Sequence, residues 1–150
     1  MGKTGSLYTR QCFMDVARRR AREARVLLDY PTSQKQRDGA VTMALIAAEC
    51  ALKAALLQGL QANSVGDLAG RSEADLFRGT TGHDLLAIWR GLPTNVGALA
   101  TPAESQALSL LRQANPYEHR YGAKKPLRSL AEPLIQSAEC LVDWMRALPT

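Results

Sequence analysis

The polar segment 112–122, RQANPYEHRYG, holds the side chains of this sequence that are best suited to act on a phosphate. Six residues separate Arg112 from His119, and Tyr121 follows two positions after the histidine. A histidine can accept the proton of a ribose 2′-hydroxyl, or protonate a leaving oxygen, near neutral pH. An arginine can hold the phosphate and stabilise the charge that develops on it. Arg112 and His119 are therefore candidates for acid–base chemistry on a phosphate, and this chemistry needs no metal.

The same segment also fits a binding role without catalysis. Arg120 supplies a second cation, and Asn115 belongs to an Asn-Pro turn that ends the preceding helix. Arg120, Asn115 and His83 are the candidate ligand-binding residues. His83 follows a glycine at a predicted helix start, where a structural role is more common, and it joins the site only if the fold brings it near residues 119–121. A third interpretation is that the segment is only the polar end of a helix.

The sequence predicts neither a metal site nor a bound cofactor. Its three cysteines, Cys12, Cys50 and Cys140, are widely spaced and odd in number, which fits no zinc pattern and no disulfide framework. Cys50 and Cys140 lie among apolar residues of predicted helices, which indicates buried thiols in a reducing compartment. The N-terminal residues show no apolar segment typical of a signal peptide, so we expect a cytoplasmic protein.

Composition favours one helical domain and is compatible with an anionic partner. The 150 residues suit a single domain, which we place at 1–150 with its core at about 9–147. Hydrophobic residues make up 46% of the chain but aromatic residues only 5%, a mixture typical of helices rather than strands. The net charge of +5 fits RNA or a nucleotide as the partner, although it fits ordinary solubility equally well.

Helical periodicity and capping residues predict an all-α, up-and-down bundle of four main helices plus one or two short ones. Thr101, Pro102 and Glu104 form a helix start with a capping box. Thr81 and Asp84 suggest a similar box, with Thr81 as the N-cap. The predicted helices cover residues 9–29, 38–61, 72–77, 81–92, 101–115 and 129–147.

Two charged residues in apolar surroundings lead to a specific contact prediction. The second helix is apolar all round from Val41 to Leu57 apart from Thr42, Glu49 and Lys53, which indicates a core helix rather than a membrane span. Arg20 falls within the apolar stripe of the first helix, whereas Arg18, Arg22 and Arg25 are expected on its solvated face. We predict a buried Arg20–Glu49 ion pair between the two helices. The alternative is that Glu49 pairs with Lys53 one turn later.

Three segments of the chain resemble the HEPN domain (higher eukaryotes and prokaryotes nucleotide-binding). They are AAECALKAALL at 47–57, GHDLLAIW at 82–89 and NPYEHRYG at 115–122. The resemblance implies an all-α bundle that dimerises. Family members are metal-free ribonucleases, often toxins, with an Arg-x4–6-His motif, or binding modules that carry an Arg-Tyr-Gly corner without it.

This chain has features of both kinds of family member. Arg112 and His119 fit the catalytic spacing at its upper limit, and Tyr121 follows as His-x-Tyr, which some of the ribonucleases show. The resemblance thus implies Arg112, His119 and Tyr121 as catalytic residues for metal-free cleavage of RNA. However, Gln113 replaces the Asn, Asp or His usual after the arginine. Arg120, Tyr121 and Gly122 supply the binding corner. The resemblance therefore implies a homodimer that binds RNA or a nucleotide, or acts as an endoribonuclease, with an antitoxin or defence-system protein as partner. A protein-interaction bundle without a small ligand is the remaining hypothesis.

Overall fold

The computed structural model of this chain describes residues 8–29, 34–78, 81–114 and 128–149, and it is an all-α bundle. Four long helices dominate it: α1 (Arg10–Asp29), α2 (Gln34–Gly59), α5 (Pro102–Arg112) and α7 (Arg128–Ala147). Within the described ranges there is no β-strand, only an isolated antiparallel bridge between Thr9 and Ser64. The predicted fold class is confirmed.

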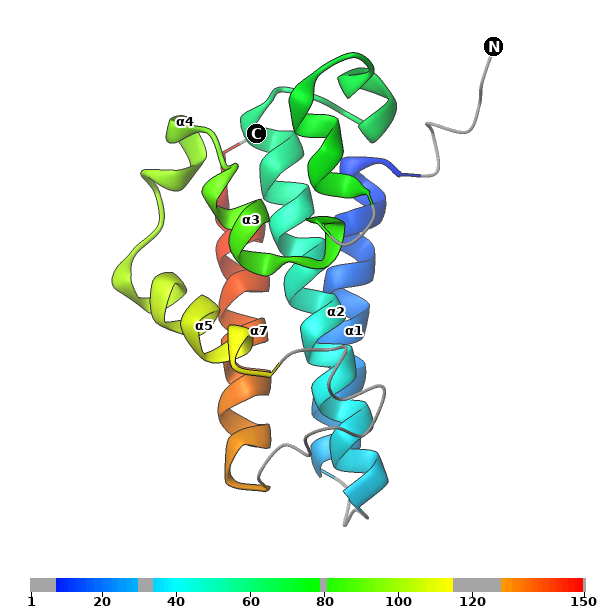
Figure 1. The fold of residues 1–150 in the computed structure, drawn as a ribbon. Helices are drawn as coiled ribbons and strands as arrows, with labels where there is room; N and C mark the ends of the chain where they lie inside the picture. The colour runs from blue at the N-terminus through cyan, green and yellow to red at the C-terminus, as the bar shows by residue number, and fades with distance from the viewer. Residues whose placement is uncertain (1–7, 30–33, 79–80, 115–127, 150) are drawn as a thin grey trace.

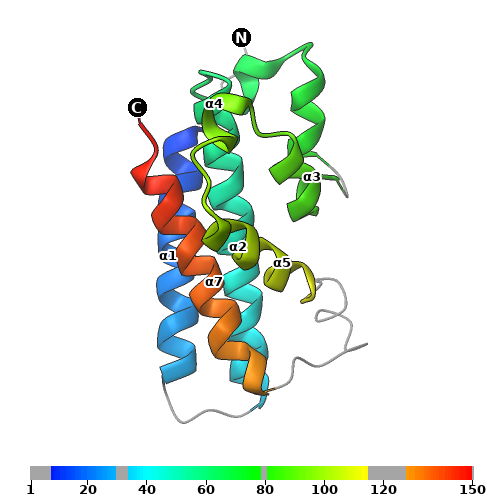
Figure 2. The same cartoon turned by 90° about the vertical axis from the view of Figure 1, so that its left-hand side faces the viewer.

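The long helices α1, α2 and α7 lie side by side, and α5 packs against α7 (Figures 1 and 2). α1 is antiparallel to both of its neighbours, while α2 and α7 run in the same direction. Short helices fill the connection between α2 and α5, and they are more numerous than predicted. They are η2 (Val65–Leu68), η3 (Ser72–Phe77), η4 (Thr81–His83), α3 (Leu85–Arg90) and α4 (Thr94–Gly97).

Helix α2 forms the centre of the bundle because it has no polar face. Its middle is packed with small and branched apolar residues that are almost fully buried, from Ala44 to Leu57. The segment Gln36–Gly59 is long and apolar enough to cross a membrane, yet 78% of its most apolar window is buried inside the bundle. That burial is what a central core helix requires.

The helix ends follow their capping residues, with two differences from the sequence prediction. Thr101 and Glu104 form the expected capping box of α5. However, α3 begins at Leu85, because the Asp84 carboxylate accepts hydrogen bonds from the N–H groups of Leu86 and Ala87. Asp84, not Thr81, is thus the N-cap of this helix. The second difference is that α2 begins at Gln34, four residues before the predicted start.

The predicted Arg20–Glu49 contact is wrong. Arg20 Nη1 donates instead to Glu23 Oε2 at 2.6 Å within α1, and both side chains are more than a third exposed. The early start of α2 explains the error. Because α1 ends at Asp29 and the antiparallel α2 begins at Gln34, Arg20 lies level with about Met43, which is about 9 Å along the helix axis from Glu49.

Arg25, which was expected on the solvated face, is the arginine that joins two helices. Its guanidinium contacts Glu132 at 2.8 Å and Glu139 at 2.6 Å, both on α7. The hydrogen bonds to the two carboxylates raise the pKa of Arg25 above its usual range, so it stays charged. α1 and α7 are therefore clamped by one guanidinium that holds two acids.

Arg25→Ala should lower the free energy of unfolding by about 1–2 kcal/mol, more than an isolated surface pair contributes, because the fork engages two carboxylates at once. Urea titration of both proteins measures the difference. Arg20→Ala is the matched control, since among the described residues Arg20 forms an ion pair only with Glu23 of its own helix. Equal losses for the two variants would contradict the clamp.

Candidate functional site

Most of the polar corner predicted at 112–122 falls outside the described residues. Asn115, His119, Arg120 and Tyr121 all lie there. Arg112 is the last residue of α5, is exposed, and makes no ion pair with any residue that the structure describes. The catalytic and binding hypotheses for this corner therefore stay predictions.

A cluster of three ionisable side chains lies where α2 contacts the connection between α2 and α5. Glu49 Oε2 accepts from Lys53 Nζ at 3.1 Å, and Glu49 Oε1 lies 2.8 Å from His83 Nδ1. The Lys53 and Glu49 side chains are only 8% and 18% exposed, whereas His83 is 51% exposed. The alternative pairing of Glu49 with Lys53 is confirmed. We refer to Lys53, Glu49 and His83 as the Glu49 cluster.

The sequence Gly82-His83-Asp84 positions the histidine of this cluster. Gly82 is buried against the preceding helix, and a Cβ at this position would lie 2.9 Å from the carbonyl carbon of Phe77. A residue without a side chain is needed for that approach. Asp84 then starts α3, so His83 is held between a close backbone contact and a capped helix.

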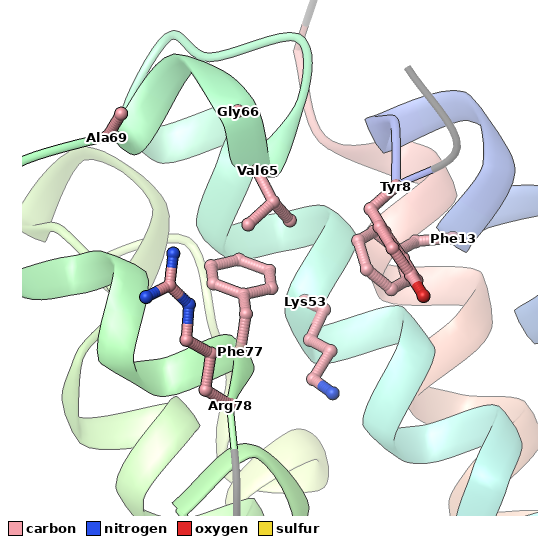
Figure 3. Close-up of a pocket in the computed structure, with 8 residues that line it drawn as sticks. All are labelled: Tyr8, Phe13, Lys53, Val65, Gly66, Ala69, Phe77 and Arg78. Atoms are coloured by element: carbon pink, nitrogen blue, oxygen red, sulfur yellow. The ribbon is translucent and has the colours of Figure 1, made fainter. Parts of the chain in front are cut away.

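An open pocket of about 510 Å³ adjoins the Glu49 cluster and contains both phenylalanines of the chain (Figure 3). Its wall combines three aromatic rings with two cations, and it joins the start of α1 to α2, η2 and η3. We call it the aromatic pocket. It is lined by Tyr8, Phe13, Lys53, Val65, Gly66, Ala69, Phe77 and Arg78.

The rings of the aromatic pocket come from two distant parts of the chain, the start of α1 and the end of η3. Phe13 and Phe77 meet with their ring centroids 5.9 Å apart, and Lys53 Nζ lies 6.0 Å from the Phe13 centroid. Tyr8 is 59% exposed, so its ring faces solvent near the mouth. In the view of Figure 3, Phe77 lies between the Arg78 side chain and the Tyr8 and Phe13 rings.

The two cations of the aromatic pocket differ in what they can offer a ligand. The charge of Lys53 is largely neutralised by Glu49. Arg78 is exposed and makes no ion pair with any other residue in the described ranges. An anion entering the pocket would therefore meet the Arg78 guanidinium as the available charge.

Sequence reasoning missed the aromatic pocket. Tyr8, Phe13 and Arg78 were not among the predicted site residues. The available signal was the scarcity of aromatic residues, which makes it notable that both phenylalanines meet at one place. The pocket itself depends on the contact between residues 8–13 and 65–78, and no local pattern predicts that contact.

Two of the three thiols, those of Cys50 and Cys140, are poor nucleophiles. Burial and the neighbouring Glu49 raise the pKa of Cys50 to about 12. Burial and Glu104 also raise the pKa of Cys140, whose Sγ lies 3.7 Å from Glu104 Oε2. In the described part of the chain, no group of three or more His, Cys, Asp or Glu residues is placed to hold a metal ion.

No protein-family model matches the chain, and neither a curated protein nor a solved structure matches it.

Proposed function

We propose that this chain is a HEPN-like helical domain that binds a nucleotide, or a nucleotide unit of RNA, through its base and phosphate. The observation that carries the proposal is the aromatic pocket, which is lined by three aromatic rings and by Arg78, a cation without an ion pair among the described residues. Its volume of about 510 Å³ falls within the range of roughly 300–1,000 Å³ that small-molecule sites occupy.

The chemistry of the pocket suits the two parts of a nucleotide. A base stacked on an aromatic side chain gains about 1–3 kcal/mol, and every base has a face that can stack. A phosphate beside Arg78 gains charge-assisted hydrogen bonds from a planar fork of donors. Lys53 contributes less, because its ammonium group is already paired with Glu49.

The polar corner belongs to this proposal as a second phosphate contact. Arg112, with Arg120 and His119, would hold a further phosphate of a longer ligand. The homodimer and the antitoxin or defence-system partner, which the resemblance implies, also stay predictions.

Equilibrium binding at low salt tests the proposed function. Adenosine 5′-monophosphate and a short single-stranded RNA should both bind in the presence of EDTA, and both affinities should fall as salt is added. Isothermal titration calorimetry gives the affinities. If neither ligand binds at low salt, the proposal fails.

A metal-free endoribonuclease is the second candidate, and the contact between Glu49 and His83 favours it. A carboxylate that fixes the orientation of an imidazole is an arrangement that general-base catalysis uses. Incubating RNA with the protein in EDTA tests this function. We expect cleavage that His83→Gln or His119→Ala abolishes, and intact RNA with the wild-type protein would exclude it.

A further inference from the structure

A second pocket lies beside the aromatic pocket and has a different lining. Its volume is about 390 Å³, and four of its side chains are carboxamides. Arg10 adds one guanidinium, which makes no ion pair with the described residues. We call it the carboxamide pocket. Its polar lining consists of Arg10, Gln58, Gln61, Asn63 and Asn95.

The two pockets meet at the bridge between Thr9 and Ser64. Tyr8 and Val65, at one end of this bridge, line the aromatic pocket, and the Val65 N–H donates to the Tyr8 carbonyl at 3.0 Å. Arg10 and Asn63, at the other end, line the carboxamide pocket, and the Arg10 N–H donates to the Asn63 carbonyl at 2.8 Å. Only Thr9 and Ser64 lie between the two linings, and two steps of extended chain span about 7 Å.

Two of the carboxamides are held in place by the backbone. Asn95 Nδ2 donates to the Gly59 carbonyl at 3.3 Å, and Gln58 Nε2 donates to the Pro149 carbonyl. These bonds fix both amide groups before a ligand arrives, which lowers the entropy that binding must spend. An amide presents a donor and an acceptor side by side, the pattern that pairs with the amino group and ring nitrogen of adenine.

Gln61 is the unusual member of the set. Its φ of 55° lies in the left-handed region, and it is the one non-glycine residue with a positive φ among the described residues. The Ala62 N–H donates to the Leu57 carbonyl at 2.9 Å, which closes the end of α2 in the way that glycine usually allows. Glycine would fit this backbone with less strain, so the presence of glutamine here suggests a functional role for its side chain.

We propose that the carboxamide pocket is a base-reading subsite for a second nucleotide. The inference rests on the proposed function: one base of a single strand stacks in the aromatic pocket, and the neighbouring base crosses the Thr9–Ser64 bridge to pair with the carboxamides. The ligand is then a phosphodiester-linked segment with unstacked bases, a form in which single-stranded nucleic acids are recognised. Arg78 and Arg10 face its backbone from the two sides.

The test compares adenylyl-adenosine (ApA), which has two bases and one phosphate, with adenosine 5′-monophosphate (AMP). We expect ApA to bind about tenfold tighter, although it carries less charge, because the second base gains a bidentate amide contact. Calorimetry in EDTA at constant salt gives both affinities. A variant with both Gln61→Gly and Asn95→Ala should bind ApA no more tightly than AMP, while its affinity for AMP stays within twofold of wild type.

The outcomes separate this inference from the proposed function. If AMP binds but ApA binds no more tightly, the second subsite is wrong while nucleotide binding in the aromatic pocket is retained. The same holds if the higher affinity for ApA survives the double substitution. If neither ligand binds, both proposals fail. The single variant Gln61→Gly controls for misfolding. Its melting temperature should be unchanged or higher, because glycine suits the left-handed backbone, while its affinity for ApA should fall.

Discussion

Replacing Glu49 with glutamine is expected to lower the free energy of unfolding by about 2–3 kcal/mol, because it leaves the Lys53 ammonium buried without its counter-charge. The Lys53 side chain is only 8% exposed, so water cannot fully replace the lost carboxylate. The same change also removes the charged partner of His83, which lies 2.8 Å from Glu49. Urea-induced unfolding followed by circular dichroism measures the loss.

Two further variants identify the cause of that loss. Glu23→Gln makes the same chemical change in the exposed Arg20–Glu23 pair and should cost less than about 1 kcal/mol. Adding Lys53→Met to Glu49→Gln removes the stranded charge and should recover much of the stability. If Glu49→Gln unfolds at the same urea concentration as wild type, Lys53 must be hydrated and the Glu49 cluster is not a buried unit.

Replacing Arg78 with alanine is expected to weaken AMP binding about ten- to a hundredfold. A hydrogen bond to a charged group is worth about 1.5–3 kcal/mol, and each 1.4 kcal/mol corresponds to a factor of ten. Arg78 is exposed and is not paired within the described structure, so its loss should affect binding much more than folding. Calorimetry with each purified variant gives the change in affinity.

The chain offers a matched control for Arg78. Arg71 is also an exposed arginine, seven residues earlier, but it lies 3.5 Å from Glu73 and does not line the aromatic pocket. Arg71→Ala should change AMP affinity by less than about twofold, since it removes only a weak long-range attraction that salt already screens. Equal effects of Arg71→Ala and Arg78→Ala would indicate attraction by overall charge and contradict a phosphate contact at the pocket.

Local sequence patterns predicted the helices well because helix formation depends on neighbours in the chain. The apolar character of residues 41–57, which contain only three polar residues, identified the central helix, and Thr101 with Glu104 identified the start of α5. The exact ends were harder to predict. Thr81 and Asp84 can both cap a helix, and Asp84 succeeded because its carboxylate reaches two backbone N–H groups of α3.

Contacts between helices were predicted poorly, because periodicity identifies a buried stripe but not the helix that covers it. Arg20 lies inside the apolar stripe of α1, yet Arg25 is the residue that faces α7. A shift of a few residues in the start of α2 was enough to separate Arg20 from Glu49. The aromatic pocket was missed for the same reason, since Tyr8 and Val65 meet only through the tertiary fold.

The most direct measurement of the central claim is an NMR titration of isotopically labelled protein with AMP. We predict that amide signals of the aromatic pocket shift together as ligand is added, above all those of Gly66, Ala69 and Arg78, while those of the exposed face of α1 around Arg18 stay fixed. Shifts confined to Arg112 and the residues that follow it would place the nucleotide at the polar corner instead. That result, or no shift at all, would contradict nucleotide binding in the aromatic pocket.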